Sequence, residues 1–130
     1  MGKKVVLVGH CGPDGSYMRM VVAKASAGVA VGMADDSAEL KAALDGGVDL
    51  VLLNRELGWG FDQQTGVEVI AAYVKAYPRT KFMVVSNYPE SQAAAVAEGA
   101  LPGFGKRELG TPRVAELIRE ALETPAPAKA

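Results

Sequence analysis

The stretch VDLVLLN, residues 48–54, decides the fold class of this chain. Four consecutive apolar residues precede the polar Asn54, and no polar residue alternates with them. A strand that is apolar on both faces is expected where helices cover both sides of a parallel sheet, because neither face then meets water. Similar runs lie at residues 5–8 and 82–85, and weaker ones lie at residues 29–31 and 101–104. The sequence therefore predicts five short strands.

Helical patterns fill the intervals between these runs. Apolar residues that recur at i, i+3, i+4 and i+7 mark the buried face of a helix. They occur at Met18, Val21, Val22 and Ala25, at Leu40, Ala43 and Leu44, at Val67, Ile70, Ala71 and Val74, and at Val114, Leu117, Ile118 and Ala121. Residues 89–100 predict a further, Ala-rich helix. A capping box at residues 65–68, Pro112 at a first helical position, and Gly46 and Gly99 at helix ends fit these predictions.

The alternation of one strand and one helix, five times over, indicates a doubly wound α/β sheet with right-handed crossovers. A chain of 130 residues suits one domain with a single core, which we place at residues 3–123. Residues 124–130 are rich in Pro and Ala, so they form either a frayed tail or the start of a linker.

The composition excludes several classes of protein. A formal net charge of −1 gives no general attraction to nucleic acid or to an anionic membrane surface. Cys11 is the one cysteine, so neither an intrachain disulfide nor a multi-cysteine metal site is available, and a reducing cytoplasm is the expected location. No apolar run is long enough to cross a bilayer, and the first residues do not resemble a signal peptide.

Polar residues and one glycine follow the predicted strands at the edge where open α/β sheets bind ligands. They are Gly9, His10 and Cys11 after the first strand, Asn54 after the third, Ser86 after the fourth and Lys106 after the fifth. The spacing of these residues does not by itself name a reaction.

Over residues 3–123 the chain resembles the receiver domain of two-component response regulators, the CheY-like fold. The matching segments are KKVVLV (3–8), VDLVLLN (48–54), TGVEVI (65–70), KFMVVSN (81–87) and EGALPGFGKREL (98–109). The resemblance implies a flavodoxin-like, three-layer fold of five βα units with strand order 2-1-3-4-5. It also implies that Ser86 and Lys106 stand at the positions that contact phosphate.

The same resemblance exposes coordinated losses. Receivers carry an acidic pair that binds Mg²⁺ where this chain has Gly9 and His10, and a phosphoacceptor Asp where it has Asn54. Their switch aromatic corresponds to Gly103, and the proline after the lysine corresponds to Arg107. Aspartyl phosphorylation needs an oxygen nucleophile and a bridging cation. We therefore expect Mg²⁺ binding to be lost, with no cofactor, no catalytic residue and no enzymatic activity.

Local interpretations of these residues remain open at the sequence level. The Asn54 amide is expected to cap the strand end by bonding to Ser86 and Lys106, with Lys106 lacking its usual carboxylate partner. His10 and Cys11 are expected in a solvated loop, although His10 is also suited to act as a pH-sensitive charge. Asp14 or Asp62 could supply a carboxylate from a flanking loop. Trp59 and Phe61 either cover the sheet edge or form an exposed anchor for a partner.

The leading functional hypothesis is a degenerate receiver, a pseudo-receiver of two-component or phosphorelay signalling. It would act by phosphorylation-independent protein–protein interaction through the face of the fourth helix, fifth strand and fifth helix. The resemblance implies that this face can also form a homodimer, while neither nucleic acid nor a membrane is an expected partner. The alternative is a sensor that binds a small anion or metabolite between Lys106, Ser86, Asn54 and His10. A third, weaker hypothesis is an ordinary phosphorylated receiver that uses Asp14 or Asp62.

Overall fold

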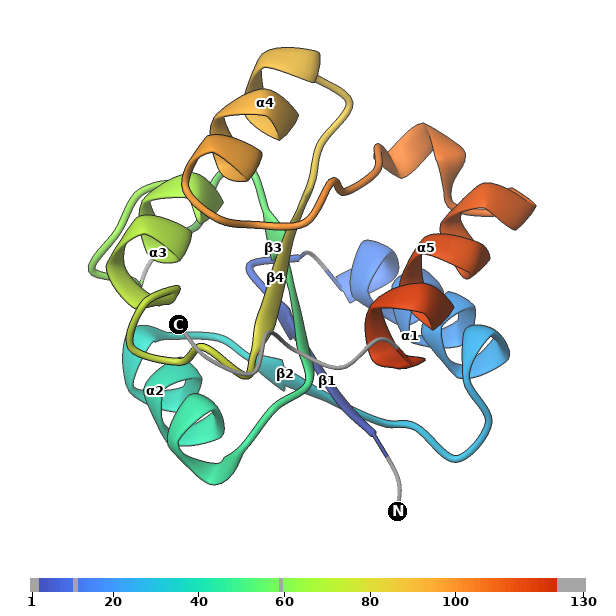
Figure 1. The fold of residues 1–130 in the computed structure, drawn as a ribbon, viewed down its shortest axis with the longest axis horizontal. Coiled ribbons are helices and arrows are strands. Elements are labelled where there is room, and N and C mark those ends of the chain that lie inside the picture. Colours follow the sequence, from blue (N-terminus) through green and yellow to red (C-terminus); the bar gives the residue numbers. More distant parts are fainter. Residues whose placement is uncertain (1–2, 11, 59, 124–130) are drawn as a thin grey trace.

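A parallel sheet lies between two layers of helices in the computed structural model of the chain (Figure 1). The structure describes residues 3–10, 12–58 and 60–123, so Cys11, Trp59 and the tail at 124–130 lie outside the described residues. The strands are β1 (Lys4–Val8), β2 (Ala30–Ala34), β3 (Leu50–Asn54) and β4 (Lys81–Val85). The helices are α1 (Gly12–Ala25), α2 (Ser37–Gly46), α3 (Gly66–Tyr73), α4 (Pro89–Ala97) and α5 (Pro112–Glu123), with a short 3₁₀ helix η1 (Lys106–Glu108).

The sheet order is β2-β1-β3-β4, and each pair of neighbours is parallel. In register, Val5 of β1 lies opposite Leu50 of β3, and Leu52 of β3 lies opposite Met83 of β4. The flavodoxin-like α/β fold predicted from the sequence is confirmed, and the carboxyl ends of the strands meet at one edge.

The fifth strand differs from the prediction. Residues 101–104 run alongside β4, since the Leu101 N–H donates to the Phe82 carbonyl and the Ser86 N–H donates to the Phe104 carbonyl, both at 2.9 Å. Between these two bonds only one parallel bridge forms, from Val85 to Phe104. The side chain of Gln92 from α4 occupies the place of the missing ladder. Within the described residues the sheet is therefore four-stranded, with the fifth segment docked rather than fully paired.

Each face of the sheet has its own apolar core. On one face α1 and α5 pack over Leu52 and its neighbours, and on the other α2, α3 and α4 pack over Leu53 and its neighbours (Figure 1). Every residue from Leu50 to Leu53 has no exposed surface. This two-sided burial explains why the strands are uniformly apolar instead of alternating.

The segment between β3 and α3 folds back along itself. Glu56 and Thr65 form an isolated antiparallel bridge, and the Leu57 N–H donates to the Gln64 carbonyl at 2.9 Å. The predicted capping box starts α3, because Thr65 accepts from the Glu68 N–H while the Glu68 carboxylate accepts from the Thr65 N–H. This fold-back positions Leu57 beside the end of β1.

Among the helices that the structure describes, none combines the length and the apolar character needed to span a bilayer.

Candidate functional site

Three of the predicted site residues surround one pocket at the carboxyl edge of the sheet. Asn54 ends β3, Ser86 follows β4 and Lys106 begins η1, and all three line a pocket of about 210 Å³. The loop residues that complete its lining are Arg55, Glu56, Asn87 and Tyr88, together with Val85. Gly9 and His10 do not line this pocket, although they lie at the same edge.

The Asn54 amide binds two loop backbones rather than Ser86 and Lys106. Its Nδ2 donates to the Gly9 carbonyl at 3.1 Å and to the Glu56 carbonyl at 3.0 Å. These bonds tie the loop after β1 to the loop after β3. A carboxylate has no hydrogen to donate, so an aspartate at this position could not make either bond. An amide is therefore the group that this arrangement requires.

Gly9 leaves little space for a side chain. Its φ of +77° lies in the left-handed region that glycine adopts without strain. A Cβ on Gly9 would lie 2.5 Å from Leu57 Cδ2 and 3.5 Å from Asn54 Cβ. A carboxylate here would need both a strained backbone and a displaced Leu57.

His10 is buried, which corrects its expected place in a solvated loop. Only 8% of its surface is exposed, and Nε2 lies 2.9 Å from the Leu52 carbonyl oxygen. Because a carbonyl can only accept, Nε2 carries the proton, while Nδ1 has no hydrogen-bond partner among the described residues. Burial lowers the pKa of the imidazole, the bond to Leu52 opposes this, and the Lys106 charge lowers it further. His10 is thus a neutral side chain facing the core.

Lys106 has a carboxylate partner after all. Its Nζ lies 2.9 Å from Asp14 Oδ2, and both side chains are about one-third exposed. Asp14 lies in the first turn of α1, so the ion pair joins α1 to η1. Asp62 lies elsewhere, with its backbone N–H donating to Ser37 Oγ at the start of α2. Of the two acidic residues considered from the sequence, Asp14 alone is shown to contact a site residue.

The donors around the pocket do not suit Mg²⁺, the ion that the receiver fold implies. Mg²⁺ prefers carboxylate oxygens in octahedral geometry. The Asn54 amide donates to the Gly9 and Glu56 carbonyls, Asp14 is paired with Lys106, and exposed Glu56 lies 3.3 Å from Arg55. Across the described ranges, no group of three or more His, Cys, Asp or Glu side chains is placed to hold a metal ion. The residues present therefore do not fit this ion.

Phe61 is partly buried against the apolar core on the face of the sheet that α2, α3 and α4 cover, and it does not line the Asn54 pocket. The neighbouring Gly60 carbonyl accepts from the Ser37 N–H at 2.9 Å, so this part of the loop lies against α2. Trp59, the other predicted anchor, lies outside the described residues.

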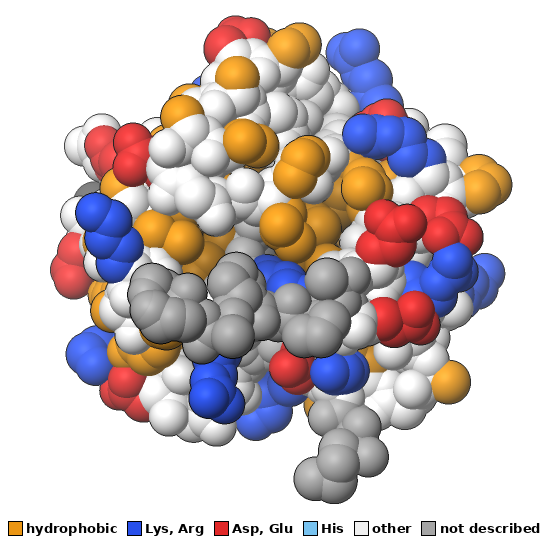
Figure 2. Space-filling model, viewed as in Figure 1, with side chains coloured by type: hydrophobic (Ala, Val, Ile, Leu, Met, Phe, Trp, Pro, Cys, Tyr) orange, Lys and Arg blue, Asp and Glu red, His pale blue; other side chains and the backbone are white. Residues whose placement is uncertain are grey.

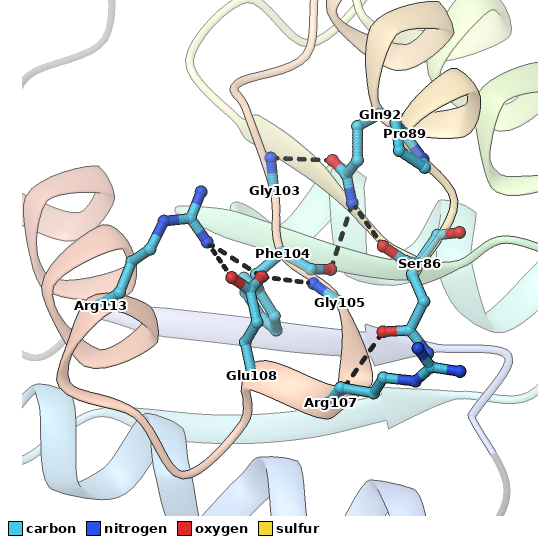
Figure 3. Close-up of a pocket in the computed structure, with 10 residues that line it drawn as sticks. Ser86, Pro89, Gln92, Gly103, Phe104, Gly105, Arg107, Glu108 and Arg113 are labelled. Atoms are coloured by element: carbon cyan, nitrogen blue, oxygen red, sulfur yellow. Dashed lines mark hydrogen bonds and ion pairs between the residues drawn. The ribbon is translucent and has the colours of Figure 1, made fainter.

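Gln92 of α4 is a residue that sequence reasoning did not single out. Its Oε1 accepts from the Gly103 N–H at 3.0 Å (Figure 3). Its Nε2 donates to the Val84 carbonyl at 2.8 Å. The same Nε2 lies 3.1 Å from the carbonyl oxygens of Ser86 and Phe104. The side chain thus replaces the missing ladder bonds beside β4. The sequence signal that could have identified Gln92 is a single Gln in an Ala-rich helix, next to a predicted strand that contains Pro102 and Gly103.

Gly103, for which the resemblance to receivers implies the switch-aromatic position, is buried against β4. A Cβ here would lie 2.2 Å from the Val84 carbonyl oxygen and 2.9 Å from Gln92 Oε1. Since the nearest atom belongs to the backbone, an aromatic residue does not fit at position 103 in this arrangement.

Apolar side chains also gather on the surface between α4 and α5, over the segment that joins them (Figure 2). Val96 of α4 is 44% exposed, and Leu101 and Leu117 are partly buried beside the core. Charged side chains lie beside this surface on the side of α5 (Figure 2). An apolar patch with a charged rim is typical of a protein-interaction surface.

Comparisons with known proteins identify the fold. No protein-family model matches the chain, and no curated protein gives a significant match. Among solved structures, NtrX from Brucella abortus superposes with a TM-score of 0.74 at 20% identity over 95% of this chain. The chain spans only 27% of that NtrX chain.

Two isolated receiver domains match almost end to end. The signal receiver domain of the DNA binding response regulator protein (merR) from Colwellia psychrerythraea 34H has a TM-score of 0.73 at 14% identity, covering 94% of this chain and 99% of its own. The beryllofluoride-activated NtrC4 receiver domain dimer has a TM-score of 0.72 at 17% identity, covering 92% and 96%. With its parallel β2-β1-β3-β4 sheet, the chain therefore has the CheY-like fold of response-regulator receiver domains.

Proposed function

We propose that this chain is a receiver-like signalling module that acts through protein–protein interaction without being phosphorylated. One observation carries the proposal. The residue at the phosphoacceptor position, Asn54, uses its amide hydrogens to hold the loops after β1 and β3 together. Position 54 thus carries a side chain that stabilises the two loops and not a reactive group.

The surrounding geometry supports this reading. Leu57 lies against Gly9, His10 faces the core, and Lys106 is neutralised by Asp14. An amide does not attack phosphorus, and the donor set does not suit the cation that would bridge it to a phosphate. Around this pocket, the described residues form no pair of nucleophile and base, which argues for a binding role rather than catalysis.

The surface between α4 and α5 is the proposed docking face. It combines exposed apolar side chains with a charged rim (Figure 2). One of the similar solved structures is a receiver domain dimer, so a second copy of this chain is one partner to test there. A cytoplasmic signalling protein is the other. We assign the module to residues 3–123, with residues 124–130 as a tail or linker.

Amide NMR during titration with Mg²⁺ and beryllofluoride tests the proposal. We expect the resonances of Asn54, Ser86 and Lys106 to stay in place with the full mixture. Movement that requires both Mg²⁺ and beryllofluoride would show a working phosphorylation site and overturn the proposal. Movement with inorganic phosphate alone would instead support the anion sensor. A receiver domain with an intact acidic site, titrated in parallel, controls for the activity of the mixture.

A further inference from the structure

A second pocket lies on the other side of the turn formed by Ser86 and Asn87. It has a volume of about 340 Å³ and lies between α4, residues 103–105 and the start of α5 (Figure 3). Ser86 and Asn87 are the residues that it shares with the Asn54 pocket. The remaining lining includes Gln92 and three charged side chains, Arg107, Glu108 and Arg113.

Gln92 fixes the shape of this pocket. Its carboxamide joins α4 to the carbonyls of Val84, Ser86 and Phe104 and to the N–H of Gly103. Separating these elements would leave several partly buried polar groups without partners, which is unfavourable. The pocket is therefore formed before any ligand arrives, and a ligand that enters it meets little of the ordering cost of binding.

The charges around the pocket leave one cation without a counterion. Both Glu108 carboxylate oxygens lie 2.9 Å from Arg113, and one of them also accepts from the Gly105 N–H at 2.9 Å. The Arg107 N–H donates to Asn87 Oδ1 at 3.1 Å, which holds its backbone. Within the described ranges the Arg107 guanidinium forms no ion pair, and it lies on the opposite side of the pocket from Arg113 in Figure 3. Two arginines and one glutamate give the lining one net positive charge.

We infer that this pocket receives an aspartate or glutamate side chain of a protein partner, with Arg107 as its anchor and Gln92 as the positioning residue. The inference rests on the proposed interaction function and names the kind of partner. Guanidinium and carboxylate groups match in geometry as well as in charge. Tyr88, on the same loop, is 51% exposed and carries the Arg55 guanidinium 4.6 Å from its ring centroid. Tyr88 lines the neighbouring Asn54 pocket, next to Ser86 and Asn87, which the two pockets share. Its exposed ring can contact a partner residue adjacent to the acid, and Tyr and Arg are enriched among residues that dominate binding energy.

A random-peptide display library selected against the folded chain tests the inference. Selected peptides should be enriched in Asp and Glu, and their binding should shift the amide resonances of Gly103, Gly105 and Arg107. Arg107→Glu should weaken that binding about tenfold or more, because it replaces attraction by repulsion. The matched control is Arg79→Glu, since Arg79 is an exposed arginine just before β4, at the opposite edge of the sheet. This control should bind the peptides as the wild type does.

Gln92→Leu supplies a second arm. It should weaken peptide binding while far-ultraviolet circular dichroism stays unchanged, and Gln64→Leu, at an exposed glutamine before α3, should change neither. Selected peptides without acidic enrichment, or full binding to Arg107→Glu, would overturn the inference. Displacement of the peptides by equal amounts of free citrate or phosphate would assign the pocket to small anions and also overturn it. A failed proposed function would appear separately, as the beryllofluoride response of Asn54.

Discussion

The two pockets on either side of the Ser86–Asn87 turn have opposite properties. In the Asn54 pocket the polar groups are engaged within the chain, through the Asn54 amide bonds and the pair of Lys106 with Asp14. In the Gln92 pocket the carboxamide of Gln92 holds the lining segments together, and the Arg107 guanidinium, which also lines the pocket, forms no ion pair within the described residues. The comparison teaches that the polar groups of one pocket can be engaged within the chain while a charged group of the neighbouring pocket stays available to a ligand.

The largest expected effect comes from adding a side chain at Gly103, where no space is available. Gly103→Ala places a Cβ 2.2 Å from the Val84 carbonyl oxygen, so the segment must leave β4. We expect the free energy of unfolding to fall by about 3 kcal/mol or more, as measured by urea denaturation. Gly46→Ala is the control, because its Cβ meets no atom within 4 Å and should change stability by about 0.5 kcal/mol or less. Equal stability of the two variants would contradict the close approach.

Removing the Gln92 carboxamide should have the next largest effect. Gln92→Leu leaves the Gly103 N–H and the Val84 carbonyl without their side-chain partner, at a cost of about 2 kcal/mol. Hydrogen exchange should show faster exchange of the Gly103 amide in this variant. Unchanged protection of that amide would mean that Gln92 does not hold the segment.

A smaller loss of stability is expected when Asn54 is replaced by aspartate. Asn54→Asp removes both donors to the Gly9 and Glu56 carbonyls and sets a negative charge beside them. We expect a destabilisation of about 1 kcal/mol at neutral pH and no magnesium-dependent labelling by acetyl phosphate. Urea denaturation and intact mass spectrometry give the two readings. A magnesium-dependent gain of one phosphoryl group would show that the Asn54 pocket keeps its chemistry.

The smallest effect is a pH dependence carried by His10. Its folded-state pKa is lowered, chiefly by burial, so the unfolded chain binds the proton more readily. The stability that neutral His10 provides is present above the unfolded pKa of about 6.5 and is lost as the pH falls from there through the folded value. Urea denaturation between neutral and mildly acidic pH should show this loss in the wild type and less of it in His10→Leu. Parallel curves for the two proteins would place the titrating group elsewhere.

The sheet, the helices and the common edge were predictable because they follow from periodicity. The two-sided apolar run at residues 50–53 identified a strand between helix layers, and the Thr65 capping box located the start of α3. These signals are local in sequence. The extent of the fifth strand was not predictable, because the pairing of residues 101–104 with β4 depends on Gln92, a residue of the neighbouring helix α4.

The partners of the site residues were less predictable than their places. Asn54, Ser86 and Lys106 share one pocket, as strand ends in a parallel sheet should. The sequence could not show that Asn54 bonds to backbone carbonyls or that Asp14 reaches Lys106, because both contacts join loops distant in sequence. His10 was misplaced for a related reason: a histidine beside glycines suggests solvent, whereas the bond to Leu52 draws it inward.

The side chain of Leu57 also bears on what evolution can reach from this sequence. A magnesium-binding acidic cluster would require new carboxylates at Gly9, His10 and Asn54, and the first of these would need Leu57 to leave its position. Each substitution made alone would reduce stability before any cation was bound. At His10 and Asn54 it removes a hydrogen bond, and at Gly9 it strains a backbone whose φ is +77°. A path of single mutations toward an acidic cluster at this edge would therefore first pass through less stable proteins.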